Sequence, residues 1–131
     1  MAGKFELFEF EDLDNIRVQA RHADILRTVR AHPLAFKHLM ETPWSWTYWR
    51  ACGRPVACAG ILYTGDAWAF LGEDMKDDMV PFFRATRNVL EAYSGAVGPV
   101  KSQIDTGHPE AVRWARLLGF RQAAGENWKF S

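Results

Sequence analysis

The sequence predicts a mixed α+β fold in which a central twisted sheet of about six or seven strands has helices on both faces. Apolar residues recur with helical spacing in several segments, whereas between residues 44 and 73 they alternate with a period of two. A strand, a long helix and another strand then follow one another, and this succession forms a right-handed parallel crossover. Because the preceding strands are joined by short turns and are antiparallel, the predicted sheet is mixed.

Length and composition predict one domain over residues 1–131. A hydrophobic content of 48% is sufficient for a single core. Sixteen basic residues balance sixteen acidic ones and no run of Lys and Arg is present, so we expect no binding to nucleic acid. Charged residues interrupt the apolar stretch near the N-terminus, which therefore resembles neither a signal peptide nor a membrane span. We expect a cytoplasmic protein that does not bind membranes.

The N-terminal third predicts one strand and two helical segments. Residues 4–10 mix Phe with charged residues in rough alternation, which favours a strand. Apolar positions at helical spacing, opened by acidic residues, predict a helical region over residues 11–30. This region ends at His32-Pro33. A second helix is predicted over Leu34–Met40 and ends before Thr42-Pro43, because the residue that precedes a proline disfavours the helical conformation.

Three antiparallel strands are predicted between Trp44 and Glu73. Turn signals at Gly53-Arg54-Pro55 and Gly65-Asp66 divide this stretch. The second and third strands, Val56–Tyr63 and Ala67–Leu71, are apolar throughout, which favours a position in the middle of a covered sheet.

The C-terminal half contains the clearest helix of the chain. Its first turn has a proline, its last turns have arginines, and Gly119 follows its end. The elements predicted in this half are a helix from Asp77 to Gly95, a strand over Val100–Ile104, a helix over Pro109–Leu118, and strands over Phe120–Ala124 and Trp128–Phe130.

Cys52 and Cys58 are the two cysteines, and they flank the turn at Gly53-Arg54. A turn centred there places Cys58 opposite Trp49, so the two thiols do not face each other. The pair also lacks the second cysteine pair or the spaced histidines of a zinc site. We expect two small strand residues, no disulfide and no metal site.

The pattern Leu118-Gly119-Phe120 after a short helix resembles the last conserved block of the GNAT family of acyl-CoA N-acyltransferases. Phe10-Glu11-Asp12-Leu13 is similar to the family's first strand-to-helix transition, and the predicted order of elements is that of the GNAT fold. Within the family, the chain looks most like the small GNAT-like internal virion proteins of short-tailed phages, through Gly53-Arg54-Pro55 and Gly65-Asp66-Ala67-Trp68. The resemblance implies acetyl-CoA as the cofactor and an amine of a small molecule or peptide as the acceptor.

The resemblance also implies a cofactor site. In the family, a glycine-rich Arg/Gln-x-x-Gly-x-Gly/Ala loop between the fourth strand and the long helix presents backbone N–H groups to the pyrophosphate. The residues of this chain that correspond to the cofactor site are Phe70, Leu71, Gly72, Lys76, Asp78, Met79, His108 and Trp114.

The loop over residues 72–79 departs from the family pattern. It has one glycine, four acidic residues and one lysine, and thus a local charge of minus three where a polyanion would bind. Two unit charges about 4 Å apart interact by about 4 kcal/mol at an effective dielectric constant of about 20, whereas a helix N-terminus contributes about 0.3–1 kcal/mol. The loop is therefore either a degenerate pyrophosphate site or an acidic turn in which Asp77 or Asp78 caps the long helix.

Glu73 and His108 are the candidate catalytic residues. Glu73 follows the fourth strand, where the family separates two parallel strands to admit the thioester, and its carboxylate can take a proton from the amine. Asp74 is a second candidate, and both also fit solvated turn acids. His108 replaces the family's usual asparagine and is an acid, a pantetheine contact, or only the residue that starts the helix. Ala115 replaces the tyrosine with which the family often protonates the departing thiolate.

The chain has six tryptophans, most of them in the predicted meander. Alternation directs Trp49 to the face opposite Trp44 and Trp46, so both faces of that strand are apolar. We expect a homodimer or docking to virion components through this region. Two functions remain open: an acyl-CoA-dependent N-acetyltransferase, and a catalytically inactive GNAT-like structural or accessory protein of a phage or prophage particle.

Overall fold

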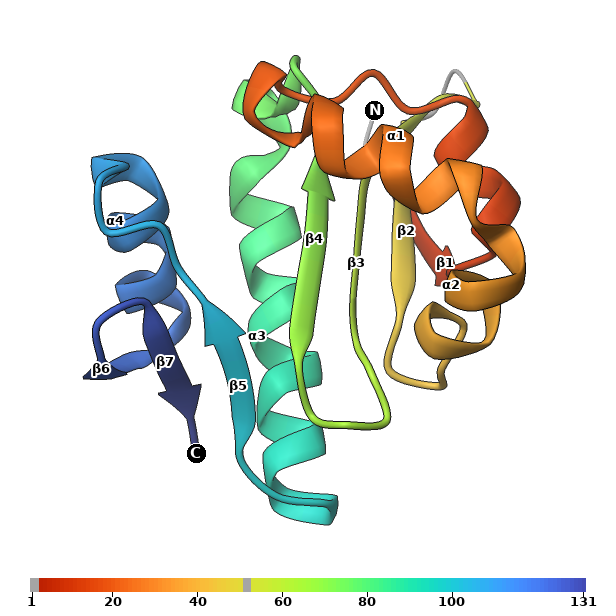
Figure 1. The fold of residues 1–131 in the computed structure, drawn as a ribbon. Coiled ribbons are helices and arrows are strands. Elements are labelled where there is room, and N and C mark those ends of the chain that lie inside the picture. Colours follow the sequence, from red (N-terminus) through yellow and green to blue (C-terminus); the bar gives the residue numbers. More distant parts are fainter. Residues whose placement is uncertain (1–2, 51–52) are drawn as a thin grey trace.

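The computed structural model describes residues 3–50 and 53–131, and it places their strands in two antiparallel sheets (Figure 1). The first sheet has the order β1-β2-β3-β4 and the second the order β5-β7-β6. The strands are β1 (Lys4–Leu7), β2 (Trp46–Trp49), β3 (Pro55–Ile61), β4 (Ala67–Leu71), β5 (Val100–Gln103), β6 (Arg121–Ala124) and β7 (Asn127–Phe130). The α+β class predicted from the sequence is confirmed.

Helices cover both faces of the first sheet. On one face, α1 (Ala23–Ala31) and α2 (Pro33–Met40) pack over a core with Phe8, Leu26 and Phe70 among its members. On the other face, α3 (Met79–Ala96) packs against the sheet, and α4 (Pro109–Leu118) packs beside the second sheet. Among the described helices, none is both long enough and apolar enough to cross a membrane.

β4 and β5 are parallel neighbours that meet at one end (Figure 1). Asp66 and Lys101 form a single parallel bridge, and the Lys101 N–H donates to the Gly65 carbonyl at 2.8 Å. Beyond this bridge the two strands diverge, as Figure 1 shows. The parallel crossover from β4 through α3 to β5 is thus present as predicted. The expected continuous sheet is instead two sheets with a gap between them.

The helical region predicted over residues 11–30 is broken into pieces. Two short 3-10 helices, η1 (Phe10–Asp14) and η2 (Ala20–His22), precede α1, and an extended segment lies between them. Val18 in that segment forms an isolated antiparallel bridge with Gly72. Pairing with a residue far along the chain therefore overrides the local helical spacing.

The Arg17–Gln19 segment lies along the end of β4. The Gln19 N–H donates to the Leu71 carbonyl at 2.9 Å, and the Glu73 N–H donates to the Arg17 carbonyl at 2.8 Å. The segment thus occupies the last part of the outer edge of β4, where the strand runs toward α3.

Cys58 faces Thr47 across β2 and β3, and not Trp49 as predicted. The difference arises at the turn: the Arg50 N–H donates to the Arg54 carbonyl at 2.9 Å and Trp49 pairs with Pro55, so the turn lies earlier in the chain than Gly53-Arg54. Cys58 is free and buried, and burial raises the pKa of its thiol to about 12. Cys52 lies outside the described residues.

α4 has the capping pattern that its sequence predicts. Pro109 stands in the first turn, and Nδ1 of His108 accepts a hydrogen bond from the Ala111 N–H at 3.1 Å. Gly119 ends the helix with a φ of 107°. The N-terminal cap fixes the orientation of the His108 ring.

Candidate functional site

The outer edge of β4 presents main-chain hydrogen-bonding groups to the gap beside β5. Successive residues of a strand direct their N–H and C=O groups to alternate sides. The carbonyls of Gly65 and Leu71 bond to Lys101 and Gln19, so both point away from β3. Ala69 has the same phase and therefore directs its N–H and C=O into the gap, and it is exposed. An extended ligand with amide groups can pair with this edge as an added strand does.

A cavity of about 490 Å³ fills the gap and continues beneath α3. Its walls come from η2, α1, β2, β3, β4, α3, β5 with the loop that follows, and α4. Aromatic and aliphatic side chains make up most of the lining. A cavity of this size and character is typical of a small-molecule or cofactor site.

Arg21 crosses the mouth of the cavity from η2 to α4. Its guanidinium carbon lies 5.2 Å from the centre of the Trp114 ring, which is a cation–π contact. Burial lowers the pKa of Arg21, while the charges of Glu110 and Asp105 act in the opposite direction. The two walls of the gap are thus linked at the mouth by one side chain.

Two histidines line the cavity. Burial first, and then the charges of Arg21 and His108, lower the pKa of His22 to about 4, so its ring is neutral at pH 7. Nε2 of His22 is buried and has no hydrogen-bond partner among the described residues. Because Nδ1 of His108 accepts a hydrogen bond, the proton of its neutral ring is on Nε2. The cavity therefore has one unpaired imidazole nitrogen and one N–H donor.

Three further polar atoms of the lining have no hydrogen-bond partner within residues 3–50 and 53–131. Nε1 of Trp46, Nε1 of Trp68 and Oγ1 of Thr86 are buried and bond to none of the described residues. An unsatisfied buried donor costs about 1–3 kcal/mol, and such groups in a cavity mark places where a ligand or water is bound.

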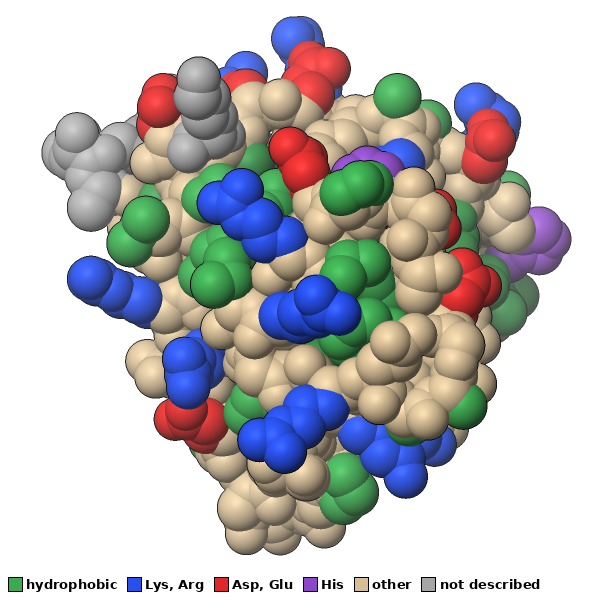
Figure 2. Space-filling view, turned by 90° about the vertical axis from the view of Figure 1, so that its left-hand side faces the viewer, with side chains coloured by type: hydrophobic (Ala, Val, Ile, Leu, Met, Phe, Trp, Pro, Cys, Tyr) green, Lys and Arg blue, Asp and Glu red, His purple; other side chains and the backbone are tan. Residues whose placement is uncertain are grey.

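The side of the molecule that carries α4 is rich in exposed basic side chains. Figure 2 views this side and shows Lys and Arg spread over its centre, with Asp and Glu mostly toward its margins. The exposed arginines of α3, α4 and β6 are Arg84, Arg87, Arg113, Arg116 and Arg121. The field of such a surface attracts anionic ligands.

Arginines neutralise two of the carboxylates in the 72–79 loop. Arg50 donates through Nη1 to Asp74 at 2.9 Å and through Nη2 to Asp78 at 2.6 Å. Arg54 also pairs with Asp74. The hydrogen bond to Asp78 is the main reason that the pKa of Arg50 is raised. The local charge counted from the loop residues alone therefore overstates the negative charge at this place.

Asp78 does not cap α3. It stands at the N-cap position, but its carboxylate accepts hydrogen bonds from the Tyr48 hydroxyl at 3.0 Å and from Nε of Arg50 at 3.0 Å. Asp77 is exposed. The cap predicted from the sequence is thus wrong for Asp78, because tertiary partners take the carboxylate that would bond to the helix.

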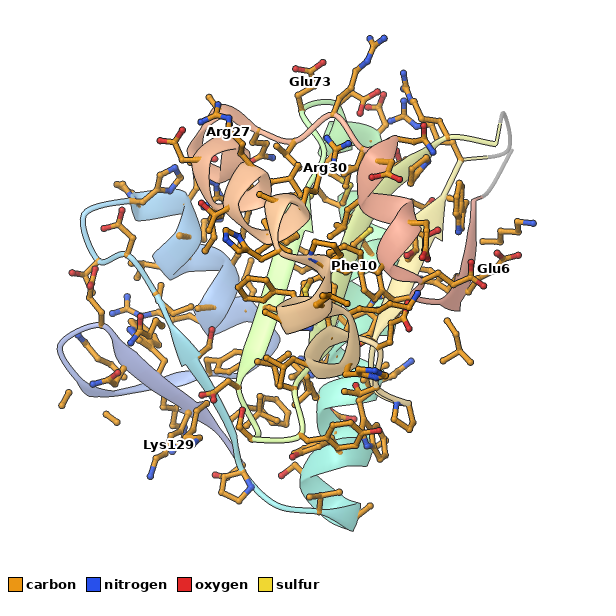
Figure 3. All side chains as sticks on the ribbon, turned by 45° about the vertical axis from the view of Figure 1, so that its right-hand side comes forward. Glu6, Phe10, Arg27, Arg30, Glu73 and Lys129 are labelled. Atoms are coloured by element: carbon orange, nitrogen blue, oxygen red, sulfur yellow. The ribbon has the colours of Figure 1, made fainter. Side chains whose placement is uncertain are left out.

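Glu73 lies outside the cavity lining. It is exposed, and Figure 3 shows its side chain at the top edge of the molecule, directed away from the ribbon. Gly72 also lies outside the lining, and its absent side chain serves the sheet: an added Cβ would lie 2.4 Å from the Val56 carbonyl oxygen. The glycine is explained by close strand packing.

Five of the eight residues predicted for the cofactor site line the cavity. Those in the lining are Phe70, Leu71, Met79, His108 and Trp114. Asp78 lies outside it with Gly72 and Glu73, and the Lys76 side chain is outside the described part of the chain.

Sequence reasoning missed many lining residues, among them Arg21, His22, Trp46 and Thr86. One of them had a visible signal, since Thr86 is a hydroxyl residue in the apolar stripe of a helix. Within the described residues, no group of three or more His, Cys, Asp and Glu is arranged to hold a metal ion.

The sequence matches no protein-family model and no curated protein. The structure, however, is similar to solved structures over nearly its whole length. A protein from Bordetella pertussis assigned to the GnaT family of acetyltransferases superposes with a TM-score of 0.63 at 15% identity, covering 98% of this chain and 95% of that one. The chain has the fold of the GNAT acetyltransferases.

Two further neighbours agree. Phosphinothricin acetyltransferase from Sinorhizobium meliloti, solved in complex with AcCoA, has a TM-score of 0.61 at 11% identity and covers 98% of this chain and 86% of that one. A mutant of the spermidine N-acetyltransferase SpeG from Vibrio cholerae has a TM-score of 0.58 at 11% identity, with coverages of 97% and 90%. At these identities the likeness shows the fold, and none of these neighbours supports a link to phage virion proteins.

Proposed function

We propose that this protein is an N-acyltransferase that takes its acyl group from acyl-CoA. The observation that carries the proposal is the open edge of β4, where the N–H and C=O of Ala69 face a cavity between diverging strands. The pantetheine arm of coenzyme A has two amides, which pair with such an edge as a peptide would. The thioester supplies an activated acyl group, and the bound arm would hold it inside the gap.

The residues present fit the acyl-pantetheine part of the cofactor better than its pyrophosphate. The cavity supplies an unpaired strand edge and buried polar atoms that lack partners. Asp78 is drawn away from α3 by Tyr48 and Arg50 and does not cap the helix. The 3-10 helix Met75–Asp78 runs directly into α3, however, and Pro81 in the first turn of α3 has no N–H to offer an anion. The amide of Glu73 is also already bonded to Arg17. We expect the basic side seen in Figure 2 to supply part of the attraction for the phosphates.

His22 is the proposed proton carrier and His108 the proposed donor to the leaving group. Transfer forms a C–N bond, breaks the C–S bond, and moves one proton from the amine to the thiolate. The unpaired Nε2 of His22 accepts the amine proton, the Nε2–H of His108 stabilises the departing thiolate by a hydrogen bond, and the proton held by His22 then passes to the sulfur. Because the pKa of His22 is low, the acceptor must bind as the neutral amine. Glu73 and Asp74 stay alternative bases, acting through water from outside the cavity.

A second candidate is a GNAT-fold protein without turnover. It is favoured by the Arg17–Gln19 segment, which takes the Leu71 carbonyl and the Glu73 amide from the edge that an extended cofactor would use. Association with a phage particle and homodimerisation stay predictions. Trp46 is buried, whereas Trp44, which packs on Tyr93, and Trp49 are both half-buried.

Calorimetric titration with acetyl-CoA tests the proposal. We expect micromolar binding and a rise in melting temperature, and no heat or stabilisation at millimolar ligand would overturn it. A thiol-release assay with a panel of small amines and peptides then measures turnover. His22→Gln and His108→Asn should lose most of kcat while binding acetyl-CoA as before, and Glu73→Gln measured beside them assigns the base.

A further inference from the structure

Two buried donors line the part of the cavity that lies between α3 and the first sheet. Trp46 is 7% exposed and Thr86 is 8% exposed, and the indole N–H of one and the hydroxyl of the other have no partner among the described residues. Both residues line the cavity. The pairing of Trp46 with Ala59 and of Ala59 with Ala69 places these three residues in one row across β2, β3 and β4.

This row forms the floor of a passage from the gap to the indole of Trp46. Neighbouring strands lie about 4.8 Å apart, so the backbones of Trp46 and Ala69 are about 10 Å apart. Ala59 and Ala69 have small side chains, so they leave space between this row and α3. On α3, Thr86 lies one turn from Phe82 and one turn from Leu90, on the face that covers this row.

The unpaired hydroxyl of Thr86 contrasts with that of another helical threonine. Thr28 in α1 donates to the Asp24 carbonyl at 3.2 Å, which is the usual way in which a helix satisfies such a group. Thr86 makes no such bond and keeps its donor free. An indole N–H also can only donate. A ligand that satisfies both must therefore offer an oxygen acceptor at this end of the passage.

The acceptor must be uncharged. The charged or ionisable residues of the lining are Arg21, His22, Asp105 and His108, and they come from η2, the loop after β5 and the start of α4. None belongs to β2, β3 or α3, which form the end of the passage. A carboxylate placed there would be buried without a cation, which is strongly unfavourable.

We propose that this passage binds an acyl group longer than acetyl whose chain carries a neutral oxygen, as a 3-oxoacyl or 3-hydroxyacyl group does. The inference rests on the proposed function, because it assumes that a thioester lies at the edge of β4. From that position an acetyl group is too short to reach Trp46 and Thr86. A four-carbon chain with an oxygen on its third carbon extends toward both donors.

The test is calorimetric titration of the full chain with acetyl-CoA, butyryl-CoA, acetoacetyl-CoA and 3-hydroxybutyryl-CoA. We expect one of the two oxygenated ligands to bind at least about tenfold more tightly than butyryl-CoA, since butyryl fills the passage but offers no acceptor. Thr86→Val and Trp46→Phe keep shape and remove the donor, and each should reduce this preference about fivefold.

Trp49→Phe is the matched control, because Trp49 also has a buried Nε1 with no partner in the described part of the chain but does not line the cavity. It should leave the preference unchanged. If acetyl-CoA binds but butyryl-CoA and both oxygenated ligands bind equally, or if Thr86→Val keeps the full preference, the acyl-pocket inference is wrong while the proposed function stands. If none of the four ligands binds, both fail.

Discussion

The residue with the most unusual environment is His22. Its ring is half-buried against the aromatic ring of Phe70, at 6.1 Å between centroids, and it lies near the charges of Arg21 and His108. These surroundings keep it neutral under conditions in which an exposed histidine is partly charged. These surroundings suit His22 to accept a proton from an amine, but they also make its protonation unfavourable in the folded protein and so lower the free energy of unfolding in acid.

We predict that His22 makes the protein less stable as the pH falls from about 6.5 to about 4. In this window the unfolded chain binds a proton on His22 and the folded chain does not, so unfolding is favoured as the pH falls. His22→Phe should remove about 1–2 kcal/mol of this loss, a value reduced for the partial exposure of the ring. Urea unfolding at pH 7, 5.5 and 4.5 measures it. His38→Phe, at an exposed position, is the control, and parallel pH profiles for wild type and His22→Phe would refute the prediction.

At the scale of elements, helix ends were predictable where capping is local. Pro109 and Gly119 bound α4 because proline needs no N–H partner in the first turn and glycine tolerates a positive φ. The break between η1 and η2 was not predictable, because Val18 is held extended by Gly72, far along the chain. The ion pair of Asp78 was not predictable either, because its partner Arg50 follows β2 and is distant in the sequence.

We predict opposite effects for two glycine substitutions in helices. Gly119→Ala should lower the free energy of unfolding by about 1–3 kcal/mol, because its φ is 107° and a Cβ would lie 2.8 Å from the Phe130 ring. Gly95→Ala, within α3, should raise it by up to about 1 kcal/mol, since a Cβ there meets open space. Thermal or urea unfolding measures both. An unchanged free energy of unfolding in Gly119→Ala would contradict the capping argument, and a lowered one in Gly95→Ala would contradict the argument from open space and helix propensity.

At the scale of the whole molecule, the order of strands and helices followed from the sequence, and the GNAT fold with it. The site followed only in part. Leu71 and Met79 line the cavity because they end β4 and begin α3, which periodicity locates. Trp46 and Thr86 could not be assigned to a cavity, because the missing partner of a buried donor is visible only once every neighbour is in place. Glu73 was predicted to lie in the site because it follows the fourth strand, but position in the chain does not fix the direction of a side chain, and Glu73 lies outside the cavity lining.

The gap between the sheets should be visible in amide hydrogen exchange. The Ala69 N–H faces the gap, whereas that of Phe70 faces β3, so we predict that Ala69 exchanges at least about tenfold faster after correction for intrinsic rates. Saturating acetyl-CoA should slow Ala69 and leave Phe70 unchanged. Strong protection of Ala69 without ligand would show that the edge of β4 is already paired in solution.

The edge of β4 consists of peptide groups, and this affects how such a protein evolves. Mutation exchanges side chains, yet every residue other than proline keeps its N–H and C=O. A protein family can therefore exchange nearly all of its residues and still keep the strand edge to which an extended ligand binds, provided that the two strands still diverge. Selection on the ligand then acts mainly on what surrounds the strand, such as Trp46 and Thr86, so that new donors and acceptors arise on an inherited backbone.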